Sequence, residues 1–134
     1  MREKPFLEHP TGDYNTSVEA MEEAIRRLRE IPECSRWITF CAQGAGARED
    51  SYHLAEIRLL KDRLDAGIPL DVALICQEAG VDTKLISAIE SHYSIAAATP
   101  REAARFIDAL FRHHLGIRPF PDEGDNYAFG AEWA

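Results

Sequence analysis

Residues Trp37–Ala42 form a short apolar run, Trp-Ile-Thr-Phe-Cys-Ala, with bulky side chains on both of its alternating faces. A run of this kind is typical of a central strand that is covered on both sides. Such a strand requires neighbouring strands and packed helices, and the rest of the chain has to supply them. With 134 residues, the chain is long enough to bury a core of this kind in one domain.

Two segments begin with strong helix-start signals. In Thr99–Glu102, an N-cap threonine precedes a proline at the first helical position, and a glutamate follows the cap by three residues. This pattern predicts a helix that ends at Gly116. Thr16–Glu19 is a second capping box and predicts a helix that stops at Pro32. Pairs of opposite charge are expected along that helix, at Glu22–Arg26 and Glu23–Arg27.

The middle of the chain carries weaker signals. A helix is predicted over 51–66, because four apolar residues recur there at helical spacing, Leu54, Ile57, Leu60 and Leu64. Residues 70–76 fit either an alternating strand or a buried helix that ends at Gly80, and both interpretations stay open.

Three further segments complete the predicted elements. Residues 82–91 are expected to be helical and residues 92–98 to form a strand. Tyr127–Trp133 alternates at period two and predicts a last strand. The resulting fold class is α+β, a small mixed sheet of about three to four strands packed with four to five helices. Residues 1–14 are expected to form a flexible N-terminal arm, and 15–134 a single domain.

The net charge of −8 bears on the partners. An acidic protein repels phosphate backbones and anionic lipids, so neither nucleic acid nor a membrane is an expected partner. No stretch approaches the roughly 20 apolar residues that span a bilayer, and no apolar run follows the first basic residues. The expected location is the cytoplasm.

The best candidate ligand site is the glycine-containing turn that follows Trp37–Ala42. A strand, a glycine loop and a helix start would place backbone N–H groups and an arginine around an anion. Two residues from the predicted strand at 92–98 could join this site. The candidate ligand-binding residues are Gln43, Gly44, Gly46, Arg48, Tyr52, His53, His92 and Tyr93. Glycine is also needed there for tight turn geometry alone, so both interpretations stay open.

The acidic, aromatic C-terminal tail is a second candidate site. Its residues Tyr127, Phe129 and Trp133 could line a partner surface or complete the protein's own sheet. Small acidic proteins that neutralise a basic partner, as toxin-immunity proteins do, have a comparable composition.

Residues 75–90 resemble the helix-turn-helix of phage-repressor-type DNA-binding proteins. The positions that carry the resemblance are Cys76, Gly80, Val81, Ile86, Ile89 and Glu90. It implies that residues 71–90 bind DNA, with Thr83, Lys84, Leu85 and Ala88 facing the bases. These four side chains include one basic group and no arginine, glutamine or asparagine for base edges.

Signatures of catalysis and metal binding are missing from the sequence. It contains no Gly-x-Ser-x-Gly elbow, no His-x-x-x-His pair and no Cys-x-x-Cys pair. The three cysteines, Cys34, Cys41 and Cys76, are therefore interpreted as small apolar residues with free thiols. We expect no metal and no cofactor.

The preferred interpretation is a non-catalytic protein that binds a protein partner or a small molecule. Such a protein could act as a homodimer. DNA binding and a small-molecule enzyme at the 43–53 turn are the alternatives.

Overall fold

The computed structural model describes residues 7–9, 17–30, 37–45, 52–65, 71–89, 92–115 and 128–133. Within these ranges the chain forms three α-helices, α1 (Ser17–Glu30), α2 (Val72–Ala79) and α3 (Pro100–Leu115), and one 3-10 turn, η1 (Thr83–Leu85). It also forms seven strands, β1 (Leu7–His9), β2 (Ile38–Ala45), β3 (Tyr52–Leu60), β4 (Arg63–Asp65), β5 (Ser87–Ile89), β6 (His92–Ser94) and β7 (Ala128–Trp133).

The seven described strands make one sheet in the order β1-β7-β2-β3-β4-β6-β5, and every pairing is antiparallel. The predicted α+β class is confirmed. The predicted details are corrected for the described residues. The sheet is antiparallel rather than mixed and has more strands than expected, and the described chain has fewer helices than expected. The C-terminal strand is also confirmed, and it lies inside the sheet, between β1 and β2.

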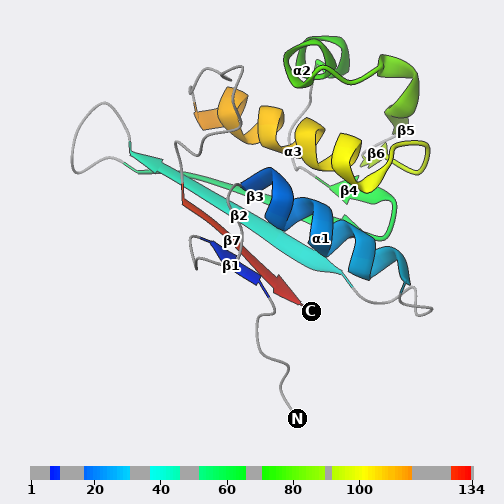
Figure 1. Ribbon diagram of the computed structural model, residues 1–134. Helices are drawn as coiled ribbons and strands as arrows, with labels where there is room; N and C mark the ends of the chain where they lie inside the picture. Colours follow the sequence, from blue (N-terminus) through cyan, green and yellow to red (C-terminus); the bar gives the residue numbers. More distant parts are fainter. Residues whose placement is uncertain are drawn as a thin grey trace.

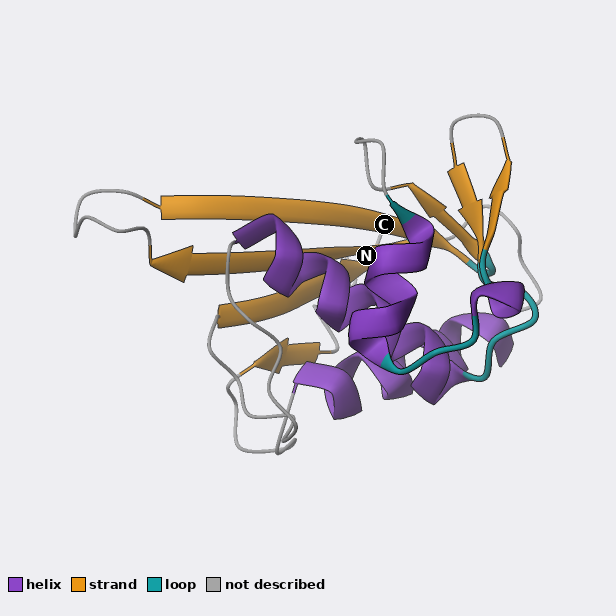
Figure 2. Cartoon of the chain, turned by 90° about the horizontal axis from the view of Figure 1, so that it is seen from above, coloured by secondary structure: helices purple, strands orange, loops and turns teal. Residues whose placement is uncertain are grey.

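The helices form a layer on one face of the long strands. Figure 1 shows α1 and α3 side by side over β2 and β3, with α2 packed on the far side of α3. Figure 2, seen from above, shows the helices lying over the strands. The sheet contributes to the common core through side chains of β2 and β3 that are at most 1% exposed, Ile38, Phe40, Ile57 and Leu59.

The other face of β2 is not buried in the same way. Trp37, Thr39 and Cys41 alternate with the two core residues of β2, and all three are only partly buried. The expectation that this strand is buried on both sides is therefore wrong for the described residues. Its sequence is apolar on both faces, whereas the described helices pack on one.

The largest correction concerns the helix predicted over 51–66, because its described residues, 52–65, form the strands β3 and β4 and the turn between them. β2 pairs with β3 along its whole length, from Ala45–Tyr52 to Ile38–Leu59, and β3 then turns through Lys61 into β4. Lys61 takes the left-handed conformation, with φ of 49°, in this tight turn. The leucine spacing fits a helix, but the alternation of Ile57 and Leu59 fits the buried face of a sheet. Pairing with β2 decides between them.

The middle of the chain contains both correct and incorrect predictions. Residues 72–79 are a helix, which settles the choice left open for 70–76 in favour of the helix ending at Gly80. The Asp71 side chain accepts a hydrogen bond from the Leu74 N–H, and Gly80 closes the helix with φ of 69°. The helix predicted over 82–91 is wrong, because its described residues form η1 and β5. The strand predicted over 92–98 is confirmed for its first part, β6.

The capping box of α3 is confirmed in full. The Glu102 N–H donates to Thr99 Oγ1 at 3.2 Å, and the Thr99 N–H donates to Glu102 Oε1 at 2.9 Å. The corresponding residue of α1, Thr16, lies outside the described residues.

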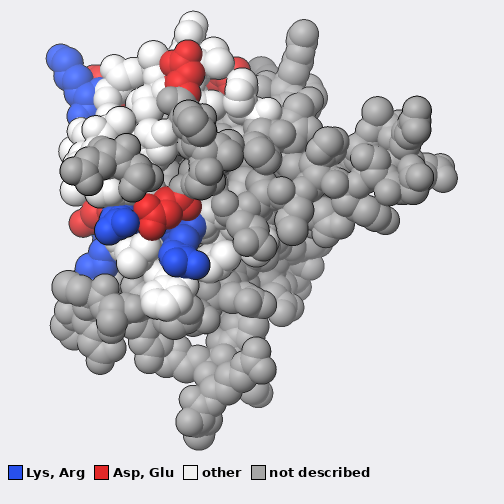
Figure 3. Space-filling view, turned by 180° about the vertical axis from the view of Figure 1, so that it is seen from behind, with Lys and Arg blue, Asp and Glu red and all other residues white. Residues whose placement is uncertain are grey.

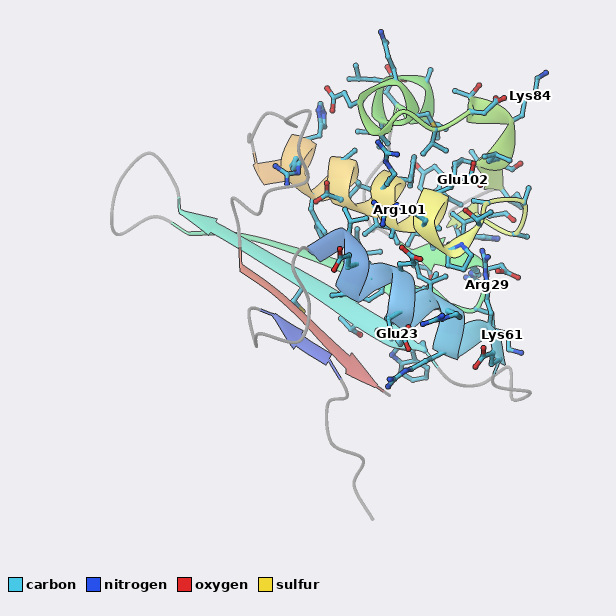
Figure 4. All side chains as sticks on the ribbon, in the orientation of Figure 1. Glu23, Arg29, Lys61, Lys84, Arg101 and Glu102 are labelled. Atoms are coloured by element: carbon cyan, nitrogen blue, oxygen red, sulfur yellow. The ribbon has the colours of Figure 1, made fainter. Side chains whose placement is uncertain are left out.

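The ion pairs of α1 differ in part from the prediction. Arg27 Nε donates to Glu23 Oε1 at 2.9 Å, as predicted, while Arg26 also pairs with Glu23. Glu22 pairs instead with Arg101 at 3.2 Å and so links α1 to α3. Figure 4 shows Glu23 on α1 and Arg101 on α3, above it.

Candidate functional site

Antiparallel pairing brings the two candidate segments together at one end of the sheet. Gln43 of β2 lies between Leu54 of β3 and Ala128 of β7, and the next residue, Gly44, lies opposite His53. The turn at 43–53 and the C-terminal tail were predicted as separate sites. We call the place where β7, β2 and β3 meet at Ala128, Gln43 and Leu54 the sheet end.

The helix start expected beside this turn is replaced by a strand in the described residues. Gln43 and Gly44 lie in β2, while Tyr52 and His53 lie in β3, so the segment is a hairpin rather than a strand followed by a helix. A hairpin provides no helix N-terminus, and the predicted dipole is therefore missing at residues 52–53. Two other candidate residues, Gly46 and Arg48, lie outside the described residues.

His92 and Tyr93 lie far from the sheet end. Tyr93 pairs with Leu64, which pairs with Leu59 near the opposite end of β3. The six-residue separation between His53 and Leu59 corresponds to about 20 Å along a strand. The two half-buried residues of β6 therefore cannot join His53 in one small-molecule site.

The tail residues are spread along β7. Phe129 lies opposite Ala42, beside the sheet end, while Trp133 lies opposite Ile38 near the other end of β2. Tyr127 lies outside the described residues. The tail thus completes the protein's own sheet, and only its first part adjoins the candidate turn.

His9 is a neighbour of the sheet end that the sequence did not indicate. It lies in β1 opposite Phe129, and Phe129 lies opposite Ala42 of β2. The strand β1 has three residues, Leu-Glu-His, which is too short for an alternating pattern to be recognised.

The sequence places much of the excess negative charge in connections that join the sheet end. The connection 10–16 leaves the neighbouring strand β1 at His9, 46–51 joins β2 to β3, and 116–127 enters β7. Together they contain six acidic and two basic residues, and their net charge of −4 is half of the net charge of −8. By contrast, the residues whose side chains are described include ten basic and eleven acidic residues. Figure 3 shows that basic and acidic groups lie side by side on the face it displays. The described surface is therefore nearly balanced in charge.

The face of the sheet away from the helices carries an aromatic and a basic side chain in contact. The Arg58 guanidinium lies over the Trp37 ring, 5.3 Å from its centroid. Arg58 is exposed and Trp37 is partly buried. Among the side chains that the structure describes, this face therefore presents a cation and a partly exposed indole.

The described cysteines fit a structural role. Cys41 is partly buried, and Cys76 is buried on α2; neither forms a disulfide. Burial raises the pKa of the Cys76 thiol, and the nearby negative charge of Asp82 raises it further. Cys34 lies outside the described residues. In the described part of the chain, no group of three or more His, Cys, Asp or Glu residues could hold a metal ion.

The segment that resembles a helix-turn-helix has a different structure. Its first helix corresponds to α2, but residues 81–89 form no second helix. Thr83, Lys84 and Leu85 lie in the 3-10 turn η1, and Ala88 lies in the exposed strand β5. Figure 4 shows Lys84 at the edge of the molecule, pointing away from it. The recognition helix implied by the resemblance is thus replaced by a turn and a strand.

Among the described residues, no helix is both long and apolar enough to cross a membrane. Comparisons with protein-family models, with curated proteins and with solved structures found no match to this chain.

Proposed function

We propose that this is a non-catalytic binding protein that recognises a protein partner at the sheet end. The observation that carries the proposal is the strand register, in which Gln43 lies between Leu54 and Ala128. The 43–53 turn and the C-terminal tail are separate candidate sites in the sequence, and this register makes them neighbours on three adjacent strands. A surface built on paired strands holds its binding groups more rigidly than a surface built on a single loop.

Charge supports a basic partner. Three connections that join the sheet end contain six acidic and two basic residues, whereas the described side chains are nearly balanced. A charge excess at one place steers an oppositely charged protein during diffusional encounter and increases its association rate. Salt should then slow association, since the Debye length falls from about 10 Å at 0.1 M ionic strength to about 3 Å at 1 M.

A photo-crosslinking experiment tests the position of the binding surface. p-Benzoylphenylalanine is introduced at Gln43, in the sheet end, and at Gln77, an exposed residue of α2. The second position is a matched control, because it replaces the same residue type on a helix that packs on the far side of α3. Both proteins are irradiated in the cells that produce the natural chain.

We expect a basic protein to be crosslinked from position 43 and not from position 77. The charge reversals Asp122→Lys and Asp125→Lys should reduce the yield of that adduct, as should high salt in a cell extract. Equal crosslinking from both positions, no adduct from position 43, or an adduct that is insensitive to the reversals would each contradict the proposal.

A further inference from the structure

Among the described strands, β5 is the one at the end of the sheet next to β6, and its outer side is unpaired. It follows β6 as the last strand in the order, and no described strand pairs with its other side. Its three residues, Ser87, Ala88 and Ile89, are all exposed. An edge of this kind presents backbone N–H and C=O groups without strand partners, and the group that matches them is another extended backbone.

The side chains of β5 do not protect this edge. Proteins commonly block exposed edges with charged residues or proline, and Ser87–Ile89 contains neither. Ile89 is 45% exposed, and it is one of only two large apolar side chains that are exposed in the described part of the chain. The strand at the opposite edge, β1, has a glutamate and a histidine among its three residues. The two edges therefore differ in the protection that their sequences offer.

From these features we infer that β5 pairs with β5 of a second copy of this chain, which makes one continuous antiparallel sheet across a two-fold axis. In a pairing centred on Ala88, Ser87 of each copy faces Ile89 of the other. No charged residue of β5 faces its counterpart, because the strand contains none. A two-fold axis permits such self-pairing, since it presents the same edge twice in antiparallel directions.

The distribution of charge favours a second copy at this edge. The acidic connections join the sheet at β1, β7, β2 and β3, and β4 and β6 separate β3 from β5. At about 4.8 Å per strand, the acidic ends of two paired copies are separated by several Debye lengths at physiological salt, where one Debye length is about 8 Å. Two chains of charge −8 can therefore meet along β5 without bringing these ends together. This interface is distinct from the sheet end and does not depend on the function proposed for it.

Two matched substitutions test the inference. Ile89→Lys places a charge on the open edge, and Leu74→Lys places one on α2, at the other exposed large apolar residue, which is 36% exposed. Both positions are exposed, so both variants should fold, as circular dichroism can verify. Light scattering then measures the mass of each protein from about 10 µM to about 1 mM, a range that brackets the weak affinities of small interfaces.

The natural chain and Leu74→Lys should both shift from 15.1 kDa towards twice that mass as concentration rises. Ile89→Lys should weaken dimerisation by about tenfold or more, since it replaces a buried apolar contact with a charge. Hydrogen exchange at residues 87–89 should also slow as the natural chain dimerises. A natural chain that stays monomeric, equal dimerisation of both variants, or a dimer without slowed exchange at 87–89 would overturn the inference.

Discussion

Arg29 connects three parts of the fold. Its Nη1 and Nη2 donate to the carbonyl oxygens of Ala98 and Ile95 at 2.7 and 2.8 Å, and its Nε lies 2.7 Å from Asp62 Oδ1. The Ile95 N–H in turn donates to the Asp62 carbonyl oxygen at 2.8 Å. Figure 4 shows Arg29 and Lys61 near each other at the same end of the molecule. One side chain thus joins the end of α1 to the β3–β4 turn and to the segment after β6.

Replacing Arg29 with alanine should destabilise the protein by about 2 kcal/mol, because two carbonyl oxygens lose charged donors and an ion pair is removed. The matched control is Arg27→Ala on the same helix. Arg27 is 48% exposed and pairs with Glu23 one turn away, so its removal should cost about 0.5 kcal/mol or less. Urea denaturation measures both changes. Similar midpoints for the two variants would show that the Arg29 contacts do not hold these segments together.

The sequence could not predict the role of Arg29. Its partners Ile95 and Ala98 lie 66 and 69 residues away. A basic residue in the last turn of a helix also interacts favourably with the helix dipole, so its identity alone indicated only a helix end. Contacts between residues so far apart in the sequence can be identified only once the arrangement of the strands is known.

At the scale of elements, α3 shows what local sequence can predict. The helix contacts α1, α2, β2 and β3, and it begins with the reciprocal capping bonds of Thr99 and Glu102. These groups are three residues apart, so their geometry depends on the local chain alone. The predicted start of the helix is accordingly correct.

The Thr99→Ala substitution should destabilise the protein by about 1 kcal/mol, because the Glu102 N–H loses the hydroxyl oxygen that caps it. Thr99→Ser keeps a hydroxyl in the same place and serves as the control, which should stay within about 0.5 kcal/mol of the natural chain. Thermal or urea unfolding measures both. If serine and alanine have the same effect, the hydroxyl does not cap α3.

β3 shows where local sequence is insufficient. Its apolar residues satisfy a helical pattern and an alternating pattern together, and the glycine at position 67 favours the helix because it resembles a helix stop. The choice is made by β2, whose Ile38 and Phe40 pair with Leu59 and Ile57. Pairing between strands depends on tertiary context, which a single segment does not contain. The predicted anion site depended on a helix start in this segment, and the described residues form a strand there instead.

At the scale of the whole molecule, the sheet combines the candidate segments in a way that the sequence did not predict. The tail and the 43–53 turn adjoin because β7, the last strand in the chain, is inserted between β1 and β2. His92 and Tyr93 are separated from them for the same kind of reason, since β6 joins the sheet through β4. Each candidate residue can be recognised from its local sequence, whereas the strand order decides which candidate residues become neighbours.

The measurement that tests this arrangement most directly is nuclear magnetic resonance of the isotope-labelled chain. Nuclear Overhauser effects should connect the backbone of Gln43 to both Leu54 and Ala128, since these residues lie opposite it on either side. In antiparallel strands, directly opposite residues have Cα atoms about 4.5–5.5 Å apart, within range of this effect. Contacts between residues three apart throughout 52–60, with none from Gln43 to Ala128, would instead indicate a helix there and would contradict the sheet end.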